Sequence, residues 1–141
     1  MKCSVRWTGE AMSFVAETES GHVVAMDGAP EGGGRNLAPR PMEMLLAGAG
    51  GCSAYDVVLI LRRGRHDIHG CEVELVAERA PDDPKVFTRI ELQFTVRGHA
   101  LNRDAVLRAV QLSHDKYCSA TAMLAKTAHI THSVQIIDDK P

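Results

Sequence analysis

The sequence has few aromatic residues, little net charge and no long uninterrupted apolar run. Aromatic residues make up 4% of the 141 residues, and 16 basic and 18 acidic side chains leave a formal net charge of −2. This balance does not favour nucleic acid or an anionic membrane surface as a partner. The apolar runs are shorter than the roughly 20 residues that a membrane-spanning helix needs. We therefore expect neither a nucleic-acid-binding protein nor a membrane protein.

Paired metal-ligand motifs and an apolar signal region are also missing. The four cysteines lie at positions 3, 52, 71 and 118, so no Cys-x-x-Cys pair exists. His129 and His132 lie near a predicted strand whose alternation sends them to opposite faces. We therefore predict no metal site and no cofactor. The N-terminal segment has no apolar signal region, which indicates a cytoplasmic protein whose cysteines are free thiols or catalytic.

The most distinctive stretch of the chain is a predicted helix from Pro41 to Arg63 with Cys52 near its middle. Pro41 suits a first helical turn, and Gly64 is a plausible stop. Cys52 and Asp56 are one turn apart and share a face. Three interior glycines, at positions 48, 50 and 51, each cost about 1 kcal/mol of helix stability relative to alanine. A helix accepts this cost when another backbone must pass close to it, so we interpret the segment as a closely packed helix that carries a thiol.

The remaining patterns predict strands and helices that are segregated along the chain. Alternating apolar residues predict three strands within 2–27, followed by a loop over 28–41 that is rich in Gly and Pro. The segments predicted after the long helix are a hairpin over 71–78 and 89–96, a helix over 103–115 capped by Asn102, a helical stretch to 128 and a strand over 132–138. This order indicates one α+β domain over 1–141. Cys3 and Cys71 lie on apolar strand faces, so we expect them in the core.

Two cysteine-containing segments resemble the OsmC/Ohr family. Pro41-Met-Glu-Met-Leu-Leu-Ala-Gly-Ala-Gly-Gly-Cys52 resembles the family's Asn-Pro-Glu-Glu/Gln-Leu…Cys helix, with the same spacing from proline to cysteine. Lys116-Tyr-Cys118, followed by Leu124, resembles the second cysteine box, which opens a helix before a last strand. The order of elements agrees over nearly the whole chain. The runs Gly-Gly-Cys-Ser-Ala-x-Asp-Val-Val and Lys-Tyr-Cys-Ser are more similar to the YhfA-like branch than to the well-studied peroxidases.

This resemblance implies a fold, an activity and an assembly. The fold would be an intertwined homodimer in which antiparallel sheets wrap around two central helices. The activity would be that of a thiol peroxidase, which reduces organic hydroperoxides in oxidative-stress defence and is regenerated by a thiol reductant. In such a mechanism Cys52 attacks the peroxide as a thiolate and becomes a sulfenic acid, and Cys118 condenses with it to form a disulfide.

The groups that would support Cys52 depart from the family pattern. The family's arginine would fall on Ala25, and its glutamate would fall on Met42, one residue before Glu43. Arg35 and Arg40, on the loop that enters the helix, are possible substitutes for the arginine. Alone, Asp56 would raise the pKa of Cys52, whereas Asp56 paired with an arginine could orient that cation.

Two function classes therefore stay open. The first is a hydroperoxide reductase in which Cys52 attacks and Cys118 resolves; the presence of both cysteines favours it. The second is a protein of the same scaffold that binds a small apolar ligand at the dimer interface; the missing arginine favours it.

Overall fold

A computed structural model describes residues 1–139 and divides the chain into two compact units, Met1–Ala47 and a second unit that begins at Gly48. The first unit contains an antiparallel sheet in the order β1-β2-β3, formed by Cys3–Trp7, Phe14–Thr18 and Val23–Met26. The expectation that residues 1–141 form one domain stays a prediction.

The edge strand β1 is open to solvent in this chain. Val5 and Trp7 are 57% and 58% exposed, and Cys3 is also exposed. The prediction that Cys3 is a core residue is therefore wrong for the single chain. The reason is that β1 pairs only with β2, while alternation in the sequence cannot tell whether anything covers the apolar face of a strand.

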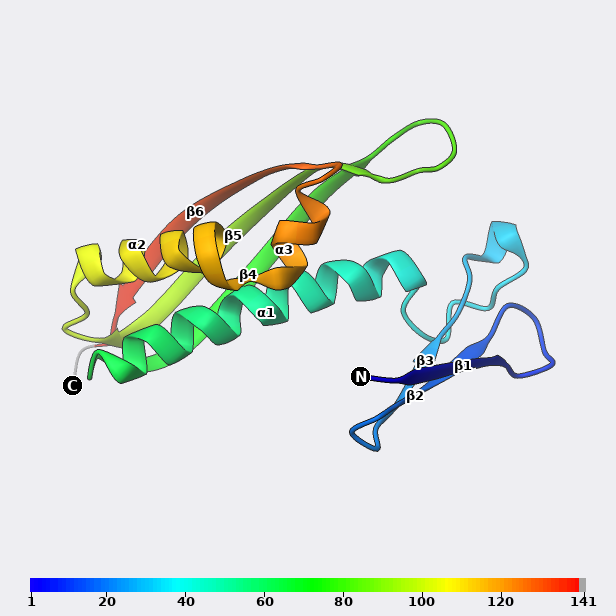
Figure 1. The fold of residues 1–141 in the computed structure, drawn as a ribbon, viewed down its shortest axis with the longest axis horizontal. Helices are drawn as coiled ribbons and strands as arrows, with labels where there is room; N and C mark the ends of the chain where they lie inside the picture. The colour runs from blue at the N-terminus through cyan, green and yellow to red at the C-terminus, as the bar shows by residue number, and fades with distance from the viewer. Residues whose placement is uncertain (140–141) are drawn as a thin grey trace. The chain divides into compact units, whose positions relative to one another are not determined.

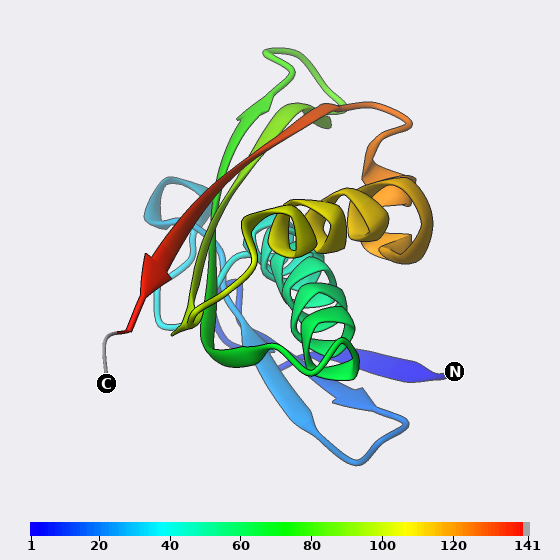
Figure 2. The same ribbon diagram turned by 90° about the vertical axis from the view of Figure 1, so that its left-hand side faces the viewer.

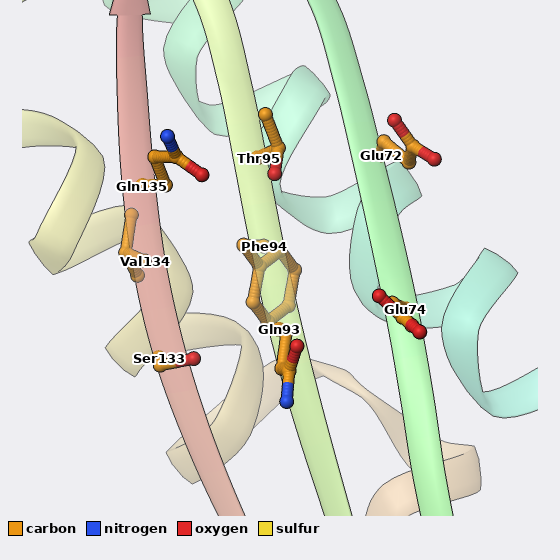
Figure 3. A pocket seen from close by; sticks show the side chains of 8 residues that line it. All are labelled: Glu72, Glu74, Gln93, Phe94, Thr95, Ser133, Val134 and Gln135. Carbon is orange, nitrogen blue, oxygen red and sulfur yellow. The ribbon is translucent and has the colours of Figure 1, made fainter.

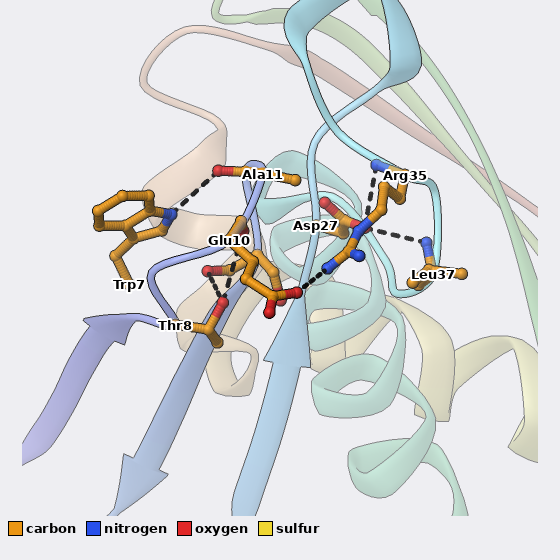
Figure 4. Close-up of polar contacts among 8 residues, drawn as sticks. Trp7, Thr8, Glu10, Ala11, Asp27, Arg35 and Leu37 are labelled. Atoms are coloured by element: carbon orange, nitrogen blue, oxygen red, sulfur yellow. Dashed lines mark hydrogen bonds and ion pairs between the residues drawn. The ribbon is translucent and has the colours of Figure 1, made fainter.

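The loop that follows β3 is organised around the buried carboxylate of Asp27 (Figure 4). Asp27 is 2% exposed and accepts hydrogen bonds from the backbone N–H groups of Gly28, Arg35 and Leu37 at 2.7, 3.2 and 3.1 Å. These bonds, of which that from Leu37 has the largest effect, hold the pKa of Asp27 below its usual value of 3.8. Burial acts in the opposite direction and is outweighed. The loop, which includes a 3-10 turn at Pro30–Gly32, is thus ordered by one side chain.

Helix α1 spans Pro41–Arg63, which confirms the predicted bounds. Its start is capped because the Glu43 carboxylate accepts a hydrogen bond from the Arg40 N–H at 2.9 Å. With 23 residues and a mean hydropathy of 1.7 over its most apolar window, α1 passes the length and composition test for a membrane span, which the apolar runs alone did not suggest. It also places Val57 and Leu61 in the core of the second unit, although 28% of that apolar window is buried within the chain.

The second unit contains a mixed sheet in the order β4-β5-β6 (Figure 1). Strands β4 (Asp67–Arg79) and β5 (Phe87–His99) are antiparallel, but β6 (His129–Asp138) runs parallel to β5. The antiparallel hairpin agrees with the sequence analysis. The parallel last strand differs from the expected antiparallel sheet, because the helices between β5 and β6 carry the chain back before it re-enters the sheet.

The helices between β5 and β6 are broken more sharply than the sequence predicted. Helix α2 spans Arg103–Leu112 and is capped by the Asn102 side chain, as predicted. It is followed by a single π-helical turn at Ser113–Tyr117 and by a short helix α3, Ser119–Leu124. The wide turn is closed by a bond from the Cys118 N–H to the Ser113 carbonyl at 2.9 Å. It therefore sets the position at which Cys118 leaves the helix.

The core of the second unit lies between one face of the sheet and its helices. Figures 1 and 2 show α2, α3 and the part of α1 in this unit on the same face. Every second residue of the central strand β5 points into this layer. The buried apolar residues of β5 and α2 are Phe87, Ile90, Leu92, Phe94, Val96, Val106, Ala109 and Val110.

Two glycines of the sheet allow a matched test of how closely β4 and β5 approach each other. A Cβ atom at Gly98 would lie 2.2 Å from the backbone oxygen of Asp67, whereas at Gly70 its nearest neighbour would be the Arg97 side chain at 3.6 Å. Because backbone cannot move aside as a side chain can, Gly98→Ala should lower the free energy of unfolding by about 1–3 kcal/mol. Gly70→Ala should change it by less than about 0.5 kcal/mol. Equal losses in urea denaturation would contradict the close approach at Gly98.

Candidate functional site

Cys118 lies at the start of α3 and caps that helix with its sulfur. Its Sγ accepts a hydrogen bond from the backbone N–H of Thr121 at 3.4 Å, in the position that a serine or aspartate oxygen normally takes. The residue is 2% exposed, so the sulfur is almost entirely removed from solvent. This arrangement follows from the local sequence, because Cys118 is followed by the helical turn that supplies the N–H.

Helix α1 presents small side chains to the Cys118 sulfur. The hydroxyl of Ser53 donates a hydrogen bond to Cys118 Sγ at 3.3 Å, and the carbonyl oxygen of Ala49 lies 4.0 Å from the same sulfur. Ser53 and Ala49 are both buried. Larger side chains at these two positions would keep α3 away from α1, so small residues are what allow the contact.

Cys52 and Asp56 complete the group on the same helix. The two sulfur atoms and a carboxylate oxygen of Asp56 all lie within 4.8 Å of one another. Both cysteines are free thiols. The other carboxylate contact of Asp56 is with Ser113, whose hydroxyl donates to Oδ2 at 2.9 Å. The structure thus brings together three of the residues predicted from the sequence.

The two thiols differ in acidity. Burial is the largest influence on Cys52 and raises its pKa above the usual 9.0, and neighbouring Cys118 and Asp56 act in the same direction. Burial also acts to raise the pKa of Cys118, but the hydrogen bonds from Ser53, Thr121 and Cys52 outweigh it and hold that pKa below 9.0. When the pair carries one negative charge, the charge therefore rests on Cys118 and the proton on Cys52.

The other predicted site residues are engaged within the first unit. The Arg35 guanidinium pairs with the Glu10 carboxylate at 3.0 Å (Figure 4). Glu43 caps the start of α1 by accepting a hydrogen bond from the N–H of Arg40. The roles of Arg35, Arg40 and Glu43 at the thiol pair stay predictions.

Sequence reasoning missed the hydroxyl groups that contact the site. Ser53 and Ser113 bond to partners on distant segments of the chain, and no local pattern indicates such contacts. The N–H of Thr121 could have been found, because it lies three residues after the residue that opens a predicted helix.

Two hollows of different character lie on the second unit. One, of about 300 Å³, is mainly apolar and is lined by Asp56, Leu59, Ile60, Arg63, Leu112 and Tyr117. The other, of about 420 Å³, lies on the face of the sheet opposite the helices and is largely polar, with Glu72, Glu74 and Gln93 among its lining residues (Figure 3). Of these two, the first includes Asp56, the carboxylate beside the thiol pair.

Comparison with known proteins gives a consistent result. The family model described as OsmC-like protein matches residues 32–133. Protein YhfA of Escherichia coli strain K12 is 48% identical over 137 residues, which are 97% of this chain and 98% of that protein. A structure solved in structural genomics is 47% identical, with a TM-score of 0.89 and coverage of 99% and 100% of the two chains. An organic hydroperoxide resistance protein from Legionella pneumophila shares the fold, with a TM-score of 0.68, 15% identity and coverage of 96% and 97%.

Proposed function

Because the chain belongs to the family of OsmC-like proteins, we propose that it is a thiol-dependent peroxidase that reduces organic hydroperoxides with Cys52 and Cys118. The observation that carries this proposal is the position of the two thiols. They come from distant parts of the sequence, and their sulfur atoms lie within 4.8 Å of each other. Two free thiols at this separation can form a disulfide after a small movement of their side chains.

The proposed reaction has two steps. The Cys52 thiolate attacks the terminal oxygen of ROOH, the O–O bond breaks, and the products are Cys52 sulfenic acid and an alkoxide that takes up a proton to give ROH. The Cys118 thiolate then attacks the Cys52 sulfur, the S–O bond breaks, and hydroxide leaves as the disulfide forms. The peroxide is reduced by two electrons, and an external thiol reductant must return them to the protein.

The environments of the two cysteines suit these roles in part. Cys52 is the less buried of the two, as the thiol that meets the substrate should be. Hydrogen bonds lower the pKa of Cys118, which favours the thiolate that later attacks the sulfenic acid. Cys52 itself needs a nearby cation. We propose that Arg35 or Arg40 supplies this charge, and that Asp56 orients it.

The apolar pocket beside Asp56 is the proposed place for the organic part of the hydroperoxide. Its lining includes Asp56, which lies beside Cys52, together with Leu59, Ile60 and Leu112. A volume of about 300 Å³ suits a small organic group. The same pocket supports the second candidate function, in which the protein binds a small apolar ligand without turnover.

We further propose that the working unit is a homodimer, in the cytoplasm, whose two copies contact through α1. Tyr55 is 68% exposed, and a Cβ atom at Gly48 or Gly51 would meet nothing within 4 Å. Glycine in a helix is unfavourable, and this chain alone gives no packing reason for it at these two positions. A second copy crossing closely over this stripe would supply the reason, with an obligate interface of well over about 2,000 Å².

The first prediction concerns the disulfide. One equivalent of cumene hydroperoxide added to fully reduced protein should remove two free thiols per chain and link Cys52 to Cys118, as measured by thiol titration and non-reducing peptide mapping. In Cys118→Ser, Cys52 should instead stall as a sulfenic acid that reacts with dimedone, and excess peroxide should over-oxidise it.

Cys71→Ser is the matched control, because this variant should form the same disulfide at the wild-type rate. A bridge that contains Cys3 or Cys71 would overturn the assignment. Dimedone labelling of Cys118 in Cys52→Ser, without labelling of Cys52 in Cys118→Ser, would reverse the two roles. Unreacted thiols together with saturable binding of an apolar ligand would favour the second candidate function.

The second prediction concerns the dimer. Gly51→Leu should place a bulky side chain in the contact between copies, and overpacking of about 1–3 kcal/mol should raise the dimer dissociation constant by about 5- to 150-fold. Sedimentation velocity measures this change, and Gly51→Ala should give a smaller effect. A wild-type protein that sediments as a folded monomer at micromolar concentration would rule out the proposed dimer.

The third prediction tests the source of positive charge. If Arg35 or Arg40 stabilises the Cys52 thiolate, its replacement by methionine should slow peroxide reduction at pH 7 roughly tenfold, the usual effect of losing an opposite charge in contact. Stopped-flow measurement of sulfenic acid formation in a Cys118→Ser background isolates this step. Because Arg35 also pairs with Glu10, Glu10→Gln is the control for loss of that ion pair. Unchanged rates in both arginine variants would exclude Arg35 and Arg40 as the groups that stabilise the Cys52 thiolate.

A further inference from the structure

The carboxylate of Asp56 lies beside the thiol pair, and no bond to it forms or breaks in the proposed oxidation steps. Cys52 and Asp56 lie one turn apart on α1, and Cys118 reaches the same point from the start of α3. The two sulfur atoms and one oxygen of Asp56 are mutually within 4.8 Å. Two sulfurs and one carboxylate oxygen, converging from separate elements, form a donor set that the sequence analysis did not anticipate because no Cys-x-x-Cys motif marks it.

We propose that the reduced protein binds one thiophilic divalent cation of the Zn²⁺ class through Cys52 Sγ, Cys118 Sγ and the carboxylate of Asp56. Thiolate ligands select such ions over Mg²⁺ and Ca²⁺, which prefer sets made only of oxygen. Three protein ligands leave a fourth tetrahedral position for water or a small thiol.

The spacing of the donors fits a tetrahedral ion after a modest contraction. Zinc–sulfur bonds of about 2.3 Å and zinc–oxygen bonds of about 2.0–2.2 Å place two ligating sulfurs about 3.8 Å apart. The three donor atoms are already within 4.8 Å of one another. Each side chain therefore has to move by no more than about 1 Å, which small side-chain rotations can supply.

The groups around the donors already hold them in place. Ser53 and Thr121 donate hydrogen bonds to the Cys118 sulfur at 3.3 and 3.4 Å. Ser113 donates to Oδ2 of Asp56 at 2.9 Å, and an ionised carboxylate has further lone pairs with which to coordinate. Hydrogen bonds of this kind fix the orientation of metal ligands and stabilise their negative charge. These hydrogen bonds therefore reduce the conformational entropy that the ligand side chains lose when the ion binds.

Binding is balanced in protons and charge. Two thiols release two protons to solvent, and the resulting thiolates and the Asp56 carboxylate contribute three negative charges to the dication. The bound site carries a net charge of −1, with no change in oxidation state. Coordinated sulfur is not available to attack a peroxide, so the ion and the hydroperoxide exclude each other. This last consequence rests on the proposed peroxidase function, whereas the binding itself does not.

Cadmium titration of the fully reduced wild-type protein, with all small thiols removed, tests the site. Cd²⁺ should bind with one equivalent per chain, as measured by equilibrium dialysis and by the sulfur-to-cadmium charge-transfer absorbance. Loss of a contact that only orients a ligand weakens metal binding about 10–100-fold. Loss of a ligand in Cys52→Ser or Cys118→Ser should therefore weaken it by at least about 100-fold. Asp56→Asn, which can keep the bond from Ser113, should weaken it at least about tenfold.

Cys71→Ser and Cys3→Ser are the matched controls and should keep the wild-type affinity and absorbance. Circular dichroism and the oligomeric state confirm that each variant is folded. Retained affinity in Cys52→Ser or Cys118→Ser, or loss of affinity in a control variant, would overturn the site. Unchanged affinity in Asp56→Asn would overturn the three-ligand arrangement.

A second measurement separates this inference from the proposed function. Disulfide formation by cumene hydroperoxide should slow in proportion to Cd²⁺ occupancy and recover when a chelator is added. Stoichiometric cadmium binding in a protein that forms no disulfide would refute the peroxidase while leaving the metal site intact. Rapid disulfide formation without measurable cadmium binding would refute only the metal site. Full cadmium occupancy with an unchanged oxidation rate would refute coordination by both thiols.

Discussion

The hydrogen bond between Ser53 and the Cys118 sulfur is the contact on which the site depends. It joins α1 to the start of α3 at a point buried from solvent, and the N–H of Thr121 donates a second hydrogen bond to the same sulfur. A sulfur in such a place would be costly to ionise without these donors. With them, Cys118 can carry a negative charge inside the protein, and its neighbour Cys52 is the natural partner for the proton.

The same contact explains the composition of α1. Ala49 and Ser53 face α3, and nothing larger would allow the Cys118 sulfur to reach the helix. Gly50 faces β4 instead, where an added Cβ atom would come within 2.6 Å of the Leu75 side chain. One run of small residues therefore lets two elements of the second unit approach α1 closely. The neighbouring glycines at 48 and 51 face neither, which is why we assign them to a second copy.

The proposed redox chemistry and the proposed metal binding use the same set of atoms. Two thiols that are close enough to form a disulfide are also close enough to hold a thiophilic ion, and Asp56 adds a third donor. Asp56, one turn after Cys52, suits both the proposed peroxidase and the proposed metal site. A carboxylate can orient a cationic side chain, and it can also coordinate a metal cation. In either case the charge of Asp56 acts to raise the pKa of the Cys52 thiol, so a nearby positive charge would favour the thiolate that the proposed reaction needs.

The sequence by itself determined the elements whose signals are local. Pro41, the helical spacing and Gly64 defined α1, Asn102 marked the start of α2, and alternation identified the β4–β5 hairpin. It also predicted a pairing of Cys52 and Cys118, because the spacing around them resembles that of a known family, and the structure places their sulfur atoms within 4.8 Å of each other. These features are encoded within a few neighbouring residues, through propensity, capping and periodicity.

Only the tertiary structure decided the features that depend on distant segments. The parallel direction of β6, the π-helical turn that positions Cys118 and the exposure of Cys3 all follow from how elements pack and not from their own patterns. The hydroxyls of Ser53 and Ser113 reach partners far along the chain, and these bonds set the order of acidity of the two thiols and the orientation of Asp56. Local sequence cannot specify such distances, because they arise only when the core between the sheet and the helices has closed.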